Sequence, residues 1–243
     1  MNEFAIIRLP LGNSGSITKK LTFEDLRSIP GSGKVSEILR KMVDGELSFA
    51  RETKDFRQYK LKCEFYGRKV SIARDVPTYR GEFDIWQHKG GLAMTVGPSM
   101  ILSRIATAFL SVSLYGEIGS SELFELKSED FSLLKEYIMK LGGEVTLLHF
   151  VGIKNTNYRV VTVTGKKLEE TEMWELAGKA NEIRRMGFRV PKLGGDRFSF
   201  WVGSAGLGSV YQPFELLPHH ISGLLSLLEK ALLPQVGKRG SKG

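Results

Sequence analysis

The sequence predicts an α+β protein in which one strand-helix-antiparallel sheet-helix unit occurs twice in tandem, with the two copies related by a pseudo-twofold axis. Three observations predict this. Similar strings recur in the same order in the two halves of the 243-residue chain, strand-like alternating runs follow the first of them, and each half closes with an apolar segment introduced by proline. We therefore expect repeats at 1–118 and 119–236 and a disordered basic tail at 237–243.

The recurring strings fix the alignment of the two copies. The most specific pair begins with Val-Pro and ends with Trp, once at Trp86 and once at Trp201. Single matches of this kind arise by chance, whereas several in the same order indicate a duplication. The matched segments are 21–26 with 126–131, 76–86 with 190–201, and 98–103 with 218–223.

Each copy is expected to open with a strand and a helix, continue with antiparallel strands, and close with a helix that begins at proline, a residue suited to the first helical turn. Copy two carries an additional helical insert near 168–180. In copy one we expect an opening strand at 4–9, a helix at 36–43, strands near 57–66, 69–76, 82–88 and 92–96, and a helix from 98. In copy two we expect an opening strand at 122–126, a helix at 132–141, strands near 144–152, 157–164, 183–190, 197–203 and 209–214, and a helix from 218.

This element order resembles that of the TATA-binding protein family, whose duplicated repeats form a saddle. The resemblance is one of element order. The repeats of this chain are longer than that family's, and the insert near 168–180 departs from its pattern. Function has to be argued from individual sites, because one fold serves many functions.

Alternation along the strands predicts which side chains face the core. Phe83, Ile85, Phe198 and Phe200 alternate with polar residues and are expected to lie under the helices. Trp86 then projects from the opposite face of the sheet, and Trp201 occupies the equivalent position in copy two. Two tryptophans on a face without covering helices favour a stacking surface for nucleic-acid bases, or an interface with another protein chain.

Basic residues accompany the second tryptophan. Lys and Arg outnumber Asp and Glu by 35 to 27, a net charge of +8 that favours polyanionic partners. We predict that one anion-accepting surface contains the two tryptophans and four arginines, namely Trp86, Trp201, Arg184, Arg185, Arg189 and Arg197.

No catalytic, cofactor or metal motif is complete. The run 30–35 lacks the first glycine and the final Ser/Thr of a phosphate-binding loop, and the glycines of 203–208 lie between two predicted strands. The single Cys63 excludes an intramolecular disulfide. Because adjacent helical residues diverge, His219 and His220 are not expected to share a metal. We predict no catalytic residue, no cofactor and no metal.

The leading hypothesis is a cytoplasmic, non-enzymatic protein that binds RNA or DNA through an open sheet face in a regulatory or architectural role. Two alternatives stay open: an interaction protein that forms a homodimer through that face, and an enzyme acting on a nucleotide or RNA between the copies. The longest apolar stretch, 100–114, contains Arg104 and is shorter than a bilayer span, so no membrane segment is expected.

Overall fold

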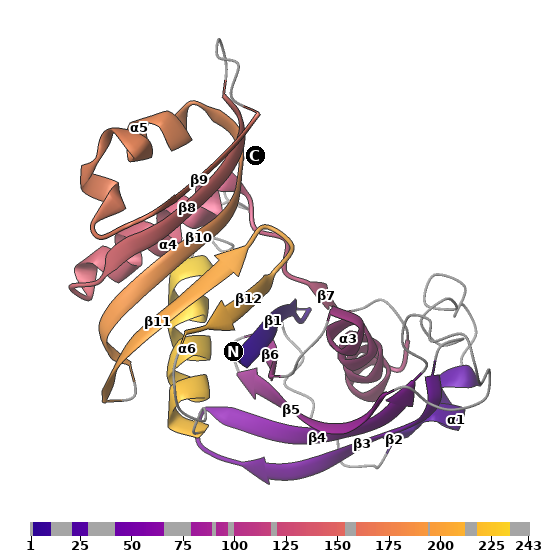
Figure 1. The fold of residues 1–243 in the computed structure, drawn as a ribbon. Coiled ribbons are helices and arrows are strands. Elements are labelled where there is room, and N and C mark those ends of the chain that lie inside the picture. The colour runs from indigo at the N-terminus through magenta and orange to yellow at the C-terminus, as the bar shows by residue number, and fades with distance from the viewer. Residues whose placement is uncertain are drawn as a thin grey trace, which may run out of the picture. The chain divides into compact units, whose positions relative to one another are not determined.

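The computed structural model describes residues 2–10, 21–28, 42–65, 79–88, 91–96, 100–117, 121–153, 159–193, 195–211 and 218–233. The chain divides into two compact units (Figure 1). The first unit is Ala5–Leu123, and the second unit is Phe124–Gly243 together with Met1–Phe4. Both combine helices with antiparallel strands, so the protein is α+β.

The first unit is a sheet with the strand order β2-β3-β4-β5-β6-β1, and β7 pairs with β1. Thr22 begins α1 with a capping box, since its side chain and that of Asp25 each accept from the other's backbone N–H. The strands are β1 (Asn2–Arg8), β2 (Leu21–Thr22), β3 (Met42–Glu52), β4 (Phe56–Phe65), β5 (Tyr79–His88), β6 (Leu92–Val96) and β7 (Glu122–Leu123). The helices are α1 (Phe23–Arg27) and α3 (Met100–Tyr115).

The core of the first unit lies between this sheet and α3, which rests against the curved strands in Figure 1. Tyr59 is completely buried and its hydroxyl donates to Oε1 of Gln87 at 2.8 Å. The other buried members include Leu47, Leu61, Phe83 and Ile85 from the strands and Ile105, Phe109 and Leu110 from α3. Alternate residues of β3, β4 and β5 therefore face α3, and the residues between them face outward.

The second unit is a sheet with the strand order β12-β11-β10-β8-β9. The short β9 and the following helix form a crossover to β10, which lies on the far side of β8. The strands are β8 (Glu144–Ile153), β9 (Val160–Thr164), β10 (Ala180–Leu193), β11 (Asp196–Gly203) and β12 (Leu207–Val210). The helices are α4 (Ser128–Lys140), the 3-10 turn η2 (Leu168–Glu170), α5 (Glu172–Gly178) and α6 (Pro218–Leu232).

The core of the second unit forms where α4 and α6 pack against β10 and against each other. The helices bury one apolar stripe each, for example Phe131 and Leu134 of α4 and Leu224 of α6. From the sheet they meet completely buried phenylalanines, namely Phe150, Phe188, Phe198 and Phe200. The predicted core positions Phe83, Ile85, Phe198 and Phe200 are confirmed, since all four are buried.

Most expected elements agree with the structure in type, including the closing helices, the helical insert and the strands at 82–88, 92–96, 144–152 and 197–203. The expected helix at 36–43 is wrong at its end, because Met42 and Val43 begin β3. Its residues 36–41, the loop 10–20 apart from Pro10, the strand 69–76 and the tail 237–243 lie outside the described residues. The expected strand 122–126 is limited to Glu122–Leu123.

The strand β3 was missed because Asp44 and Gly45 resemble the end of a helix. In the structure Gly45 lies opposite Cys63 in the ladder between β3 and β4. Long-range pairing with β4 thus outweighs the local signal. No helix among the described residues has both the length and the apolar character needed to cross a bilayer.

Candidate nucleic-acid interface

The face of the second unit's sheet opposite the phenylalanine core is set by the register of β10 and β11. Arg189 lies opposite Ser199, and Gly187 lies opposite Trp201. Since paired residues of an antiparallel ladder share a face, Arg185, Arg189 and Trp201 all project away from buried Phe188 and Phe200. By the alternation of β11, Arg197 lies on the same face.

The closest contact on this face joins Arg185 and Trp201. The guanidinium carbon of Arg185 lies 4.8 Å from the centroid of the Trp201 ring, within the range of a cation–π interaction. Arg185 is exposed and Trp201 is half-buried. In the part of the chain that the structure describes, Arg185 has no carboxylate partner. Because Arg185 is exposed, its guanidinium is accessible to an external anion.

Tyr211 follows β12 and adds a second aromatic ring to this region. Its backbone N–H donates to the carbonyl of Ser199 at 2.8 Å, and 46% of its surface is exposed. Partial burial raises the pKa of its hydroxyl, while the nearby charge of Arg185 lowers it. Tyr211 therefore lies within the electrostatic reach of Arg185 and is a neutral phenol at physiological pH. Tyr211 was not among the site residues predicted from the sequence.

The remaining arginines differ in their partners. Arg189 donates to Oε1 of Glu144 at 2.6 Å, and Arg184 donates to Oε2 of Glu182 at 3.3 Å. Arg184 occupies the bulge of β10 between Ile183 and Arg185, and it is exposed. We call this group the arginine-aromatic face: Arg184, Arg185, Arg189, Arg197, Trp201 and Tyr211.

His149 of β8 lies directly beside Arg185 in the ladder. Its Nδ1 is 2.6 Å from Oγ1 of Thr162 on β9. Partial burial lowers the pKa of His149, and the positive charges of Arg185 and Arg184 lower it further. The ring is therefore neutral at physiological pH, and the nearby arginines favour any ligand that brings negative charge.

The structure places Trp86 in the first unit, where it is only 3% exposed. The guanidinium of Arg51 lies 5.3 Å from the centroid of its ring. The expectation that Trp86 projects from an open face is therefore wrong. Alternation correctly placed it on the face opposite Ile85, but alternation does not show which neighbouring side chains enclose a residue.

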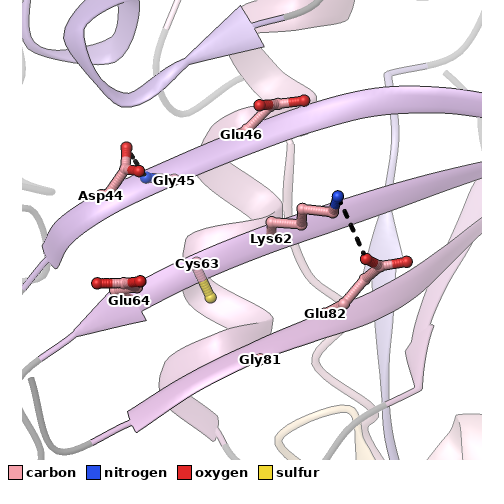
Figure 2. Close-up of a pocket in the computed structure, with 8 residues that line it drawn as sticks. All are labelled: Asp44, Gly45, Glu46, Lys62, Cys63, Glu64, Gly81 and Glu82. Carbon is pink, nitrogen blue, oxygen red and sulfur yellow. Dashed lines mark hydrogen bonds and ion pairs between the residues drawn. The ribbon is translucent and has the colours of Figure 1, made fainter.

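The outward face of the first unit carries a different charge pattern. A cavity of about 350 Å³ lies over β3, β4 and β5. Figure 2 shows the residues that line it. Four of its eight lining residues are carboxylates: Asp44, Glu46, Glu64 and Glu82. Lys60 donates to Glu82 at 2.5 Å, and this hydrogen bond holds the pKa of Glu82 below its usual value. The four carboxylates outnumber the one lysine among the lining residues, Lys62, so this surface is less favourable to phosphate than the arginines of the second unit.

The same region contains the chain's only cysteine. Cys63 is buried among the core residues of the first unit, and burial raises the pKa of its thiol to about 12. The thiolate needed for nucleophilic attack is therefore absent at physiological pH.

Five of the six residues proposed from sequence belong to the arginine-aromatic face. Strand register places Arg185, Arg189, Arg197 and Trp201 there, and Arg184 lies at the bulge of β10. Tyr211 and His149 were missed because only the register of the folded sheet brings them beside Arg185. No protein-family model matches this chain, and no curated protein sequence matches it.

Proposed function

We propose that the protein is a nucleic-acid-binding protein that holds a single strand of RNA or DNA on the arginine-aromatic face of its second unit. The observation that carries the proposal is the contact of Arg185 with Trp201, beside exposed Tyr211. Single strands are bound by sheets that combine aromatic rings, on which bases stack, with cations that contact the phosphates.

The charges of this face support an anionic ligand. Glu144 and Glu182 each neutralise one arginine, Arg189 and Arg184 respectively. Arg185 retains its positive charge and is exposed. A strand lying across β10 and β11 would meet Arg185 and Arg197 while its bases reach Trp201 and Tyr211.

An open sheet face that carries aromatic rings favours single strands over duplex. A sheet face with exposed rings offers stacking to unpaired bases, whereas duplex readout uses an element inserted into a groove. Stacking on an aromatic side chain contributes about 1–3 kcal/mol per base and tolerates any sequence. We therefore expect weak sequence preference.

Fluorescence anisotropy with labelled oligouridylate, oligothymidylate and a mixed-sequence duplex, at rising KCl concentrations, tests the proposal. Single strands should bind more tightly than the duplex. Arg185→Ala should lower the affinity and reduce the slope of log K against log salt by about 0.7 for one lost phosphate contact. Trp201→Ala should lower the affinity while leaving that slope unchanged, because stacking releases no counterions.

Arg51→Ala is the matched control, because it removes the arginine of an arginine-tryptophan contact in the first unit. It should leave binding unchanged. If the parent binds none of the three polymers at low salt, the function is wrong. If the parent is then a dimer by light scattering, and Trp201→Ala dissociates it, the face is a homodimer interface instead.

The proposal includes the tandem duplication of the chain. It is supported by the order of neighbouring strands in the two units: β3-β4-β5-β6 followed by α3 in the first, and β8-β10-β11-β12 followed by α6 in the second, with β9, η2 and α5 as an addition in the second unit. It also includes a cytoplasmic location, which the free thiol of Cys63 supports. Superposing the two strand sets tests the duplication.

A further inference from the structure

Three potential metal ligands meet at one end of the second unit's sheet, apart from the arginine-aromatic face. Asp196 is the first residue of β11, and His219 and His220 lie in the first turn of α6. One side-chain nitrogen or oxygen from each of the three lies within 4.8 Å of the other two. Among the described residues, this is the one group of three potential ligands whose donor atoms lie this close together.

The hairpin and the helix bring these residues together. Gly195 has a φ of 103°, a left-handed value that favours glycine, and it directs the chain from β10 into β11 at Asp196. His220 is 1% exposed, and its ring centroid lies 5.9 Å from that of Phe198. Packing thus fixes one imidazole, while His219 and Asp196 remain exposed.

The two histidine rings lie side by side, although they are adjacent in sequence. Their centroids are 4.1 Å apart, and the planes are inclined at 51°. Neighbouring helical residues usually diverge, and for that reason the two histidines were not expected to share a metal, but in this first turn their rings lie close together. Nε2 of His220 is 2.8 Å from Oδ2 of Asp196.

We propose that Asp196, His219 and His220 form a binding site for a divalent transition metal, with zinc as the ion that fits best. Two imidazole nitrogens and one carboxylate oxygen are the donor set of three-ligand zinc sites, which leave a fourth position for solvent. Tetrahedral ligands at Zn–N and Zn–O distances of about 2.0–2.1 Å lie about 3.3 Å apart. The 2.8 Å hydrogen bond and the 4.8 Å span bracket that separation.

Small rotations of the exposed side chains complete the geometry. Asp196 and His219 are free of core packing and can turn toward the metal, whereas His220 is already held by its burial. The bound ion would join the β10–β11 hairpin to the start of α6. Because a metal that binds only the folded state raises its stability, zinc should raise the unfolding temperature.

An ordinary hydrogen bond is the competing explanation. A carboxylate near a helix N-terminus is favourable by itself, and it can accept a hydrogen bond from His220 without any metal. That explanation assigns no role to His219. It also predicts that Asp196→Asn changes stability equally with and without zinc.

Zinc titration of the untagged full-length chain by calorimetry, combined with thermal unfolding, separates the two explanations. We expect one zinc per chain and a rise in unfolding temperature with zinc. His219→Ala and Asp196→Asn should each weaken zinc binding by at least about tenfold. Both replace exposed side chains, so the folded state should persist, as circular dichroism would show.

His149→Ala serves as the matched control, because it removes a partly exposed histidine of the same unit outside the cluster. It should leave zinc affinity unchanged. The site is wrong if the parent binds no zinc at micromolar concentrations, if the His219 and Asp196 variants bind zinc as the parent does, or if His149→Ala weakens binding equally.

Discussion

Arg185 and Trp201 form a stacked pair across adjacent strands, with the guanidinium 4.8 Å from the indole centroid. The pair lies on the face opposite completely buried Phe188 and Phe200. A positive charge and an aromatic ring therefore lie next to each other on this face. The first unit also contains an arginine-tryptophan contact, between Arg51 and Trp86, but there the tryptophan is buried.

This difference predicts which tryptophan reports on binding. Oligothymidylate should quench part of the protein's tryptophan fluorescence, because a base stacks on Trp201. Trp201→Phe should abolish most of the quenching and retain part of the affinity, since a phenylalanine ring also stacks. Trp86→Phe is the control, and quenching should persist in it. Equal quenching in the Trp201 variant and the parent would contradict the assignment.

His149 predicts a loss of stability in acid. Partial burial, Arg185 and Arg184 hold its pKa in the folded state below the unfolded value. As the pH falls through the unfolded value of about 6.5, the unfolded chain takes up a proton that the folded chain does not, so the free energy of unfolding decreases. Above that pH, His149 is neutral in both the folded and the unfolded chain, so its protonation does not change the free energy of unfolding.

His149→Gln should remove this part of the acid sensitivity. Urea unfolding at about pH 7.5 and about pH 5.5, on either side of the ordinary histidine pKa, measures it. The parent should lose more stability between the two values than the variant does. Arg185→Ala removes one of the causes of the shift and should give an intermediate loss. An identical loss in parent and His149→Gln would show that other groups determine the acid response.

Two glycines of the second unit predict opposite effects of a single methyl group. A Cβ at Gly208 would lie 2.2 Å from Cζ of Phe4 and 2.4 Å from the carbonyl oxygen of Trp201. Gly208→Ala should therefore destabilise the fold by about 1–3 kcal/mol through overpacking. A Cβ at Gly178, the last residue of α5, meets no atom within 4 Å. Gly178→Ala should stabilise by about 0.4–1 kcal/mol, as urea unfolding would show.

The sequence predicted those features that depend on local periodicity. Phe198 and Phe200 were placed in the core because a strand alternates every two residues, and pairing with any neighbour preserves that alternation. Pro218 correctly marked the first residue of α6, because proline needs no intrahelical partner there. These rules need no knowledge of which strands pair.

The features that sequence reasoning missed depend on distant partners. Burial of Trp86 involves Arg51, which comes from another strand and reaches it across Gln58. The contact of Arg185 with Trp201 depends on register, including the bulge at Arg184, which no local pattern specifies. The gathering of His219 and Asp196 likewise needs the hairpin and the helix to be folded together.

The hydrogen bond between Tyr59 and Gln87 predicts a specific cost in the first unit's core. The Tyr59 hydroxyl donates to Oε1 of Gln87 at 2.8 Å, and both residues are buried. Tyr59→Phe would leave a buried amide oxygen without this donor, which costs about 1–3 kcal/mol.

Tyr211→Phe is the matched control, because its exposed hydroxyl can be replaced by water, and it should change stability by less than about 0.5 kcal/mol. The double variant Tyr59→Phe with Gln87→Leu should recover part of the loss, since it removes the unsatisfied acceptor as well. Urea unfolding of the four proteins measures these values, and an unchanged midpoint for Tyr59→Phe would show that the hydrogen bond adds nothing to the core.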